Sequence, residues 1–323
     1  MPRVVRLWTS AAPGEGRGHL ARALALAEAT WPDDVTVELA LARGEPSPAE
    51  HGRAVAARVR IVDAAEPLPG NAAVVVDAPD PTAIVRDIPR DRLVVFDDRE
   101  TFDGVAALIV QPSLPTWSGV ARAGRVLAGY RWAPIGSAWR AAIAGGRQVH
   151  DDGRPRVLVC FGGSDPHDVT GRLGPALEDE RGWTTTIVVG TDYHGRADAG
   201  GPVVREPPDL PTRVANTDLV VTGAGTMKFE VAALGRPAIL LAVADDQLPV
   251  GPPFAEAGAA RWLGDGRTAD PEAVRAAVAA LLDDDPARSA MAMTARGLVD
   301  GRGADRLAAE ISALTGSPQT SAS

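Results

Sequence analysis

The chain is poor in the residues that support disulfide bonds and membrane insertion. Cys160 is the only cysteine among 323 residues, which excludes an intrachain disulfide and fits a reducing compartment. No apolar run approaches the roughly 20 residues of a spanning helix, and the start, MPRVVRLWTS, has no signal-peptide core. We therefore expect a cytoplasmic protein without a membrane span.

Lysine and net positive charge are also scarce. Lys228 is the only lysine, and the formal net charge is −9. Binding to a nucleic acid needs a basic stripe that neutralises successive phosphates, so this composition argues against such a partner. Hydrophobic residues make up 45% and charged residues 23% of the chain, as in globular proteins. Any phosphate that is bound should belong to a small molecule.

Short apolar runs recur in two series, each separated by helical or turn segments. This arrangement predicts an α/β fold with two mostly parallel sheets, and the length suffices for two domains. The first series comprises residues 4–8, 35–41, 59–62, 73–76, 93–96 and 107–110, and the second 157–161, 185–189, 202–205, 219–221 and 237–243.

A segment rich in Gly, Arg and Asp lies between the two series. We expect residues 141–155 to link an N-terminal Rossmann-like domain, 1–140, to a C-terminal one, 156–316. The small, polar residues 317–323 are expected to form a disordered tail.

The segment GEGRGHLARALALA, residues 14–27, follows the first apolar run and predicts a strand, a glycine-rich loop and a helix. Free N–H groups at such a helix start attract anions, usually phosphate. His19 stands where the ligand would lie, and histidine is the side chain most readily used as a general base near neutrality. Arg22 shares the helix face of His19 and could steady a phosphate or sugar oxygen.

Two other interpretations of this segment stay open. Gly14, Gly16 and Gly18 are spaced by twos, unlike the dinucleotide fingerprint, and the acidic Glu38 falls within an alternating strand pattern. A nicotinamide site is therefore disfavoured. His19 could also be an ordinary surface histidine, so its role needs further signals.

The second half repeats the order of strand, glycine loop and helix twice. In VLVCFGGSDPHDVTGRLGPAL, residues 157–177, Gly162 and Gly163 permit a tight exit from the strand and Ser164 or Asp165 can cap the helix, although a plain turn is an alternative. In DLVVTGAGTMKFEVAALGRPAILLAVADDQ, residues 218–247, a helix starts at Thr226 and could bind a pyrophosphate.

Glu230 lies four residues after Thr226, on the same helical face. Its carboxylate could accept hydrogen bonds from both hydroxyls of a ribose, and a solvated helix glutamate is the alternative. Helix boundaries nearby are well marked: Asp270 predicts an N-cap before Pro271, and Gly235 predicts a helix end.

Together these segments resemble a known group of proteins. The ordered set GEGRGHLARALALA, VVVDAPDP, VVFDD, LAGYRWAPI, VLVCFGGSDP and DLVVTGAGTMKFEVAALGRPAILLAVADDQ looks like the UDP-sugar hydrolases of pseudaminic acid biosynthesis and related spore-coat polysaccharide proteins. More distantly, it is similar to the N-acetylglucosaminyltransferase of peptidoglycan synthesis. The resemblance implies a GT-B fold, in which two Rossmann-like domains face each other across a cleft, and a UDP-sugar donor held mainly by the C-terminal domain.

The resemblance also implies roles for individual residues. His19 matches the base that activates water, and Glu230 would hold the ribose. The other residues implied to contact the substrate are Gly225 and Thr226 at the pyrophosphate, Gly163 and Ser164 at the phosphate side, and Asp77, Asp246 and Gln247 near the sugar.

Two positions depart from the hydrolase pattern. Asp246 stands where the family has asparagine, and Ala78 and Pro79 stand where it has a His-Tyr pair after the aspartate matched by Asp77. Because these positions touch the sugar in the family, the resemblance leaves the sugar and the acceptor open.

Displacement of UDP from an anomeric carbon needs an activated nucleophile and stabilisation of the departing pyrophosphate. His19 can supply the first, and the helix starts at Thr226 and near Gly18 can supply the second without a metal or other cofactor. Acidic pairs and runs lack histidines at metal-ligand spacing; they are Asp97 with Asp98, Asp245 with Asp246, and residues 283–285. In-line displacement would invert the anomeric centre.

Four functions remain, and the sequence indicates no oligomeric state. The main interpretation is a metal-independent, inverting UDP-sugar hydrolase with His19 as the base. An inverting GT-B glycosyltransferase that passes the sugar to a hydroxyl is the alternative. A nucleotide-sugar epimerase and a non-catalytic UDP-binding module are less favoured.

Overall fold

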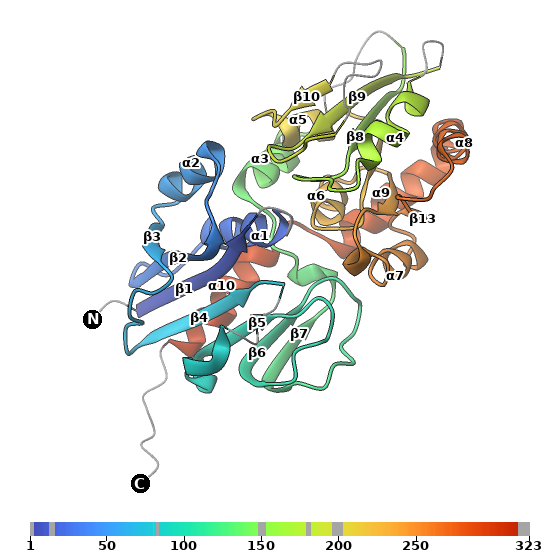
Figure 1. The fold of residues 1–323 in the computed structure, drawn as a ribbon. Helices are drawn as coiled ribbons and strands as arrows, with labels where there is room; N and C mark the ends of the chain where they lie inside the picture. The colour runs from blue at the N-terminus through green and yellow to red at the C-terminus, as the bar shows by residue number, and fades with distance from the viewer. Residues whose placement is uncertain are drawn as a thin grey trace. The chain divides into compact units, whose positions relative to one another are not determined.

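The computed structural model describes residues 3–12, 17–79, 81, 84–147, 153–178, 182–195 and 203–315. The chain divides into two compact units, which are coloured along the chain in Figure 1. Unit 1 comprises Met1–Glu15, His19–Gly136 and Arg302–Ser323, and unit 2 comprises Gly16–Gly18 and Ser137–Gly301. Gly14, Gly16, His150 and the expected tail 317–323 lie outside the described residues.

Unit 1 contains a seven-stranded sheet in the order β3-β2-β1-β4-β5-β6-β7, in which every neighbouring pair is parallel. Every residue of β4 is buried, as expected for a parallel sheet covered on both faces. The strands are β1 (Arg3–Ala11), β2 (Val35–Gly44), β3 (Arg60–Asp63), β4 (Ala72–Asp77), β5 (Leu93–Phe96), β6 (Val105–Gln111) and β7 (Arg122–Ala128).

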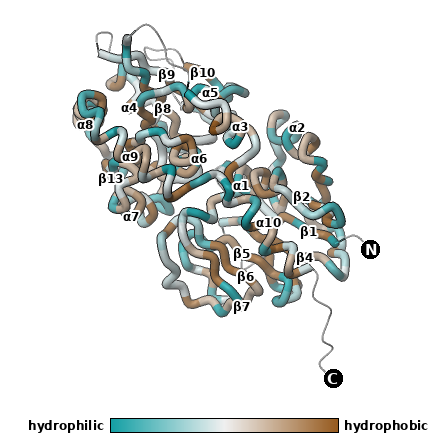
Figure 2. Tube along the Cα trace, turned by 180° about the vertical axis from the view of Figure 1, so that it is seen from behind, coloured by the Kyte–Doolittle hydropathy of each residue, from teal (hydrophilic) through white to brown (hydrophobic). Residues whose placement is uncertain are grey.

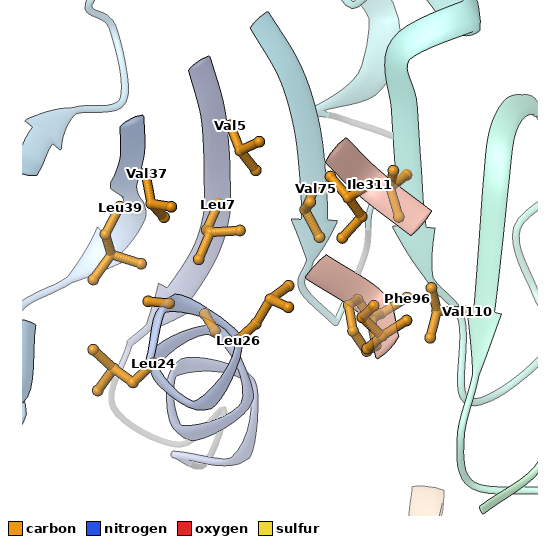
Figure 3. Packing of buried hydrophobic residues seen from close by; sticks show 14 of the residues in the cluster. Val5, Leu7, Leu24, Leu26, Val37, Leu39, Val75, Phe96, Val110 and Ile311 are labelled. Carbon is orange, nitrogen blue, oxygen red and sulfur yellow. The ribbon is translucent and has the colours of Figure 1, made fainter. Parts of the chain in front are cut away.

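The helices of unit 1 include one from the end of the described chain. Leu307 and Ile311 of α10 (Gly303–Leu314) join the core formed by α1 (Gly18–Ala27) and the strands, and Figure 3 shows Ile311 packed near Val75. A capping box at Ser47 and Glu50 starts α2 (Pro48–Ala56). Short 3₁₀ helices are η1 (Val85–Asp87), η2 (Arg90–Arg92) and η3 (Tyr130–Trp132).

Unit 2 contains a six-stranded parallel sheet in the order β10-β9-β8-β11-β12-β13. Its strands are β8 (Arg156–Cys160), β9 (Thr184–Val189), β10 (Val203–Arg205), β11 (Leu219–Gly223), β12 (Ala238–Ala242) and β13 (Arg261–Asp265). Its helices are α3 (Ser137–Gly145), α4 (Val169–Leu173), η4 (Pro175–Leu177), α5 (Leu210–Ala215), α6 (Met227–Ala233), η5 (Asp245–Gln247), α7 (Gly251–Glu256), α8 (Pro271–Leu282) and α9 (Asp285–Leu298).

The prediction of an α/β fold with two parallel sheets is confirmed. In Figure 2 the chain is largely hydrophobic along β5 and β6, which lie inside their sheet. Two domain boundaries differ from the expected ones. Helix α3 (Ser137–Gly145) overlaps the expected linker 141–155. The segment from Arg302 belongs to unit 1, although it was expected in the C-terminal domain. Among the described helices, none combines the length and apolar character needed to cross a bilayer.

Strand order places a topological switch point in each sheet. In unit 1 the order reverses between β1 and β4, and in unit 2 between β8 and β11. Ligands of open α/β sheets bind beyond the carboxyl ends of the strands at such points. The loops that follow these four strands are therefore the places to search for function.

Candidate active site

The switch point of unit 1 brings together His19, in the first turn of α1, and Asp77, the last residue of β4. His19 Nδ1 lies 2.6 Å from Asp77 Oδ1. The aspartate side chain is only 4% exposed, whereas that of His19 is 22% exposed. This places a half-buried imidazole against a buried carboxylate.

The neighbours of the imidazole determine its tautomer. A carboxylate accepts hydrogen bonds, so the proton on Nδ1 is donated to Asp77. The Nη2 group of Arg22 lies 3.2 Å from the same nitrogen but is itself a donor and does not compete as an acceptor. In the neutral ring, Nε2 is therefore the basic nitrogen.

Arg22 is engaged by the carboxylates around it. Its Nε donates to Asp77 Oδ2 at 2.9 Å and its Nη2 to Asp77 Oδ1 at 2.6 Å, which is a bidentate pair. Its Nη1 donates to Asp98, and its guanidinium carbon lies 5.2 Å from the centroid of the Phe96 ring. Arg22 therefore forms ion pairs with two carboxylates of its own unit, which the sequence did not indicate. The expected contact of Arg22 with a substrate oxygen stays a prediction.

Asp98 follows β5 and extends this network across the sheet. Ser113 Oγ donates to Asp98 Oδ1 at 2.6 Å, and Gln111 Nε2 donates to the Asp98 carbonyl at 2.8 Å. Burial alone would raise the pKa of Asp98, but the charge of Arg22 and the hydrogen bonds from Ser113 and Arg22 outweigh burial and lower it. Asp98 is thus held as a carboxylate.

Asp97 has a different use from its neighbour. Its carboxylate accepts hydrogen bonds from the backbone N–H groups of Thr101 and Phe102, both at 3.0 Å. The carboxylates of Asp97 and Asp98 therefore have separate partners and are not directed at a common ligand position. Within the described ranges, no group of three or more His, Cys, Asp or Glu side chains is arranged to hold a metal ion.

In unit 2 the glycine loop after β8 supports the start of α4. Asp165 is buried and accepts from the N–H groups of Val169 at 3.0 Å and Thr170 at 2.7 Å, while Asp168 accepts from Gly171 at 3.0 Å. The N-cap of α4 is Asp168, so neither Ser164 nor Asp165 is the N-cap, although Asp165 accepts from two N–H groups of the first turn. Carboxylates already occupy this helix start, so an anion is better placed at the other glycine loop.

The loop after β11 is packed against Gln247. Gln247 Oε1 accepts from the N–H group of Val243 at 3.1 Å. Cβ atoms added to Gly223 and Gly225 would lie 3.2 Å from the Gln247 side-chain amide, so a larger residue at either position would displace that amide by a few tenths of an ångström. Thr226 precedes α6, and no side chain of the described residues caps that helix start. Asp246 is exposed in η5.

Two ionisable side chains in α6 lie close to this loop. Lys228 is buried, and its ammonium donates to the Ala224 carbonyl at 2.8 Å. Glu230 is half-buried in the first turn of α6. Burial raises the pKa of the Cys160 thiol to about 11, and the charges of Glu230 and Asp165 contribute to the rise. The raised pKa keeps the Cys160 thiol protonated near neutral pH.

The comparisons with known proteins concern the fold. No family model matches the chain, and no curated protein matches it. MurG of Acinetobacter baumannii is 16% identical with a TM-score of 0.63, covering 97% of this chain and 100% of that one. The calicheamicin glycosyltransferase CalG4 is 15% identical with a TM-score of 0.61, covering 99% of each chain.

A third structure, HepE (Alr3699) of Anabaena in complex with UDP-glucose, is 13% identical with a TM-score of 0.60 and covers 95% of this chain and 99% of that one. These likenesses extend over nearly the whole length of each chain. The protein has the GT-B fold. In this GT-B chain each Rossmann-like unit carries polar side chains at the switch point of its own sheet.

Proposed function

We propose that the protein is a metal-independent, inverting glycosyltransferase that uses a nucleotide-diphosphate sugar, with His19 as the general base. The observation that carries the proposal is the pair of His19 and Asp77 at the switch point of a GT-B sheet. A histidine whose Nδ1–H is held by a carboxylate presents Nε2 as a proton acceptor, and the carboxylate stabilises the imidazolium that forms.

The proposed reaction is a single displacement. The acceptor oxygen forms a bond to the anomeric carbon as the bond from that carbon to the diphosphate oxygen breaks. The hydroxyl proton passes to Nε2 of His19, and the nucleotide diphosphate leaves with the bonding electron pair. Attack opposite to the leaving group inverts the configuration of the anomeric carbon.

Unit 2 is proposed to bind the nucleotide. Within the part of the chain that the structure describes, no side chain caps the start of α6, so the N–H groups near Gly225 and Thr226 suit a pyrophosphate, and Glu230 suits a ribose. Gly163 and Ser164, in the loop after β8, remain proposed contacts on the phosphate side. UDP is proposed as the nucleotide because HepE, of similar fold, is in complex with UDP-glucose.

The transferase is favoured over the hydrolase by the similar structures. CalG4 is a glycosyltransferase by name, and it covers 99% of this chain. Hydrolysis is the second candidate because His19 matches the base that activates water in the UDP-sugar hydrolases that the sequence resembles. The two reactions differ only in whether the hydroxyl of an acceptor molecule or water accepts the sugar.

A donor panel tests the proposal. The protein would be incubated with UDP-, dTDP- and GDP-sugars, with and without mixtures of acceptor alcohols, while nucleotide release is measured. A transferase releases nucleotide at a rate that rises with one acceptor, whereas a hydrolase releases it equally without acceptor. Conversion of the donor to another nucleotide sugar, or binding without release, would contradict both candidates.

A further inference from the structure

Three charged side chains, Arg22, Asp77 and Asp98, surround the candidate base His19. His19 and Arg22 come from α1, Asp77 is the last residue of β4, and Asp98 follows the neighbouring strand β5. The side chains of Arg22 and Asp77 are only 6% and 4% exposed. Water screens the charges of such buried groups only weakly, so each should affect its neighbours strongly.

The geometry of Arg22 fixes the orientation of Asp77. Nε and Nη2 of Arg22 contact different oxygens of the Asp77 carboxylate, at 2.9 and 2.6 Å. This fork resists rotation of the carboxylate, and Oδ1 consequently stays directed at Nδ1 of His19, 2.6 Å away. Lysine has a single ammonium and could not provide this fork.

The charges of the network also affect His19. When the imidazole is neutral, two carboxylates face one guanidinium, which gives the cluster one net negative charge. Protonation of His19 neutralises the cluster. Arg22 opposes this protonation, because its Nη2 lies 3.2 Å from Nδ1, whereas Asp98 favours it by offsetting the charge of Arg22.

We propose that Arg22 is a positioning residue for the pair of His19 and Asp77, and that the balance between Arg22 and Asp98 sets the pH at which His19 takes up a proton. This inference rests on the proposed function only where it treats His19 as the base. Asp97 takes no part, since its carboxylate faces the N–H groups of Thr101 and Phe102.

The proposal predicts opposite effects of two substitutions. Arg22→Met leaves two carboxylates uncompensated and should raise the midpoint of the His19 ring titration by about one pH unit or more. Asp98→Asn leaves the charge of Arg22 less balanced and should lower the midpoint by a smaller amount. The double variant has the original net charge and should return the midpoint close to the wild-type value.

The experiment is an NMR titration of the histidine rings in the full chain without substrate. The chain has 5 histidines, and loss of one resonance in His19→Gln assigns the ring of interest. Arg53→Met is the matched control, because it removes another ion pair of unit 1, with Glu28 at 2.7 Å. Arg22→Lys keeps the charge but loses the fork, so the midpoint should change little while ¹⁵N shifts report a smaller fraction of the Nδ1–H tautomer.

Opposite shifts that cancel in the double variant support the proposal. Equal midpoints in all folded variants, or the same direction in Arg22→Met and Asp98→Asn, would overturn it. If Arg22→Met does not fold, Asp98→Asn, Arg22→Lys and the double variant still decide the question. Because no substrate is present, the predicted shifts in a protein that turns over no nucleotide sugar would count against the proposed function alone.

Discussion

At the scale of single residues, buried carboxylates in similar places of the two sheets have different partners and different roles. Asp77 is the buried last residue of β4 and Asp165 is buried in the loop after β8; Asp77 contacts a histidine and an arginine, whereas Asp165 accepts hydrogen bonds from backbone N–H groups. The first arrangement can change the reactivity of a neighbour, and the second fixes a helix start. Glu230 differs from both because it is half-buried beside a helix start that no side chain caps.

The proposed role of Glu230 predicts a loss of nucleotide affinity. Glu230→Ala removes two charge-assisted hydrogen bonds to the ribose, each worth roughly 1.5–3 kcal/mol, so UDP affinity measured by calorimetry should fall at least about tenfold. Glu272→Ala is the control, since Glu272 is an exposed first-turn glutamate of α8 in the same unit. Unchanged UDP affinity in folded Glu230→Ala would remove this assignment.

The lowered pKa of Asp98 predicts that the free energy of unfolding depends on pH. The pKa of Asp98 in the folded protein lies below the ordinary value of about 3.9, so the stabilisation is present above that pH and is lost as pH falls through the lower folded value. Urea unfolding at pH 7 and near pH 3 should therefore show a smaller acid loss of stability in Asp98→Asn than in the wild type. An equal loss in both proteins would show that Asp98 is not linked to folding in this way.

At the scale of elements, the apolar runs predicted most strands, and two edge strands were missed. β7 and β13 lie at sheet edges, where one side has no neighbouring strand, and their residues are mostly half-exposed or exposed. Such strands need no continuous apolar run. The partners of Arg22 were also not predicted, because Asp77 and Asp98 lie 55 and 76 residues away and meet it only through the strand order. His19, in contrast, was singled out as a candidate base because it lies in a local glycine-rich motif that can be read from the sequence; its role as a base stays a prediction.

The glycine loops and helix starts are proposed to bind the leaving group, which predicts activity without a metal. Backbone N–H groups directed at the departing diphosphate can stabilise its negative charge. Turnover should therefore survive treatment with EDTA and gel filtration. Loss of turnover that magnesium restores would contradict this prediction, and Asp245 and Asp246 would then be the first positions to substitute.

At the scale of the whole molecule, the chain returns to its first unit near the end of the described residues. α10 follows the last helix of unit 2 but packs Leu307 and Ile311 into the core of unit 1 (Figure 3). The composition of α10 did not indicate this return, because an amphipathic helix can cover either sheet. The contacts of Leu307, which is fully buried, place it in the core of unit 1.

This arrangement predicts that each core can be weakened separately. Leu307→Ala should destabilise unit 1 by about 2–5 kcal/mol and speed amide hydrogen exchange in β1 and β4. Leu281→Ala in α8 is the matched substitution for unit 2, where Leu281 joins the second core, and should act on β8 and β11. Faster exchange in β8 and β11 in response to Leu307→Ala would contradict the assignment of α10 to unit 1.

The central claim is that His19 accepts a proton during displacement of a nucleotide diphosphate. The most direct test compares turnover and UDP affinity in the wild type and in His19→Gln. We predict that turnover falls about 10²-fold or more while UDP affinity stays nearly unchanged, because a base acts in the transition state and unit 2 is proposed to bind the nucleotide. Near-wild-type turnover in folded His19→Gln would contradict the account.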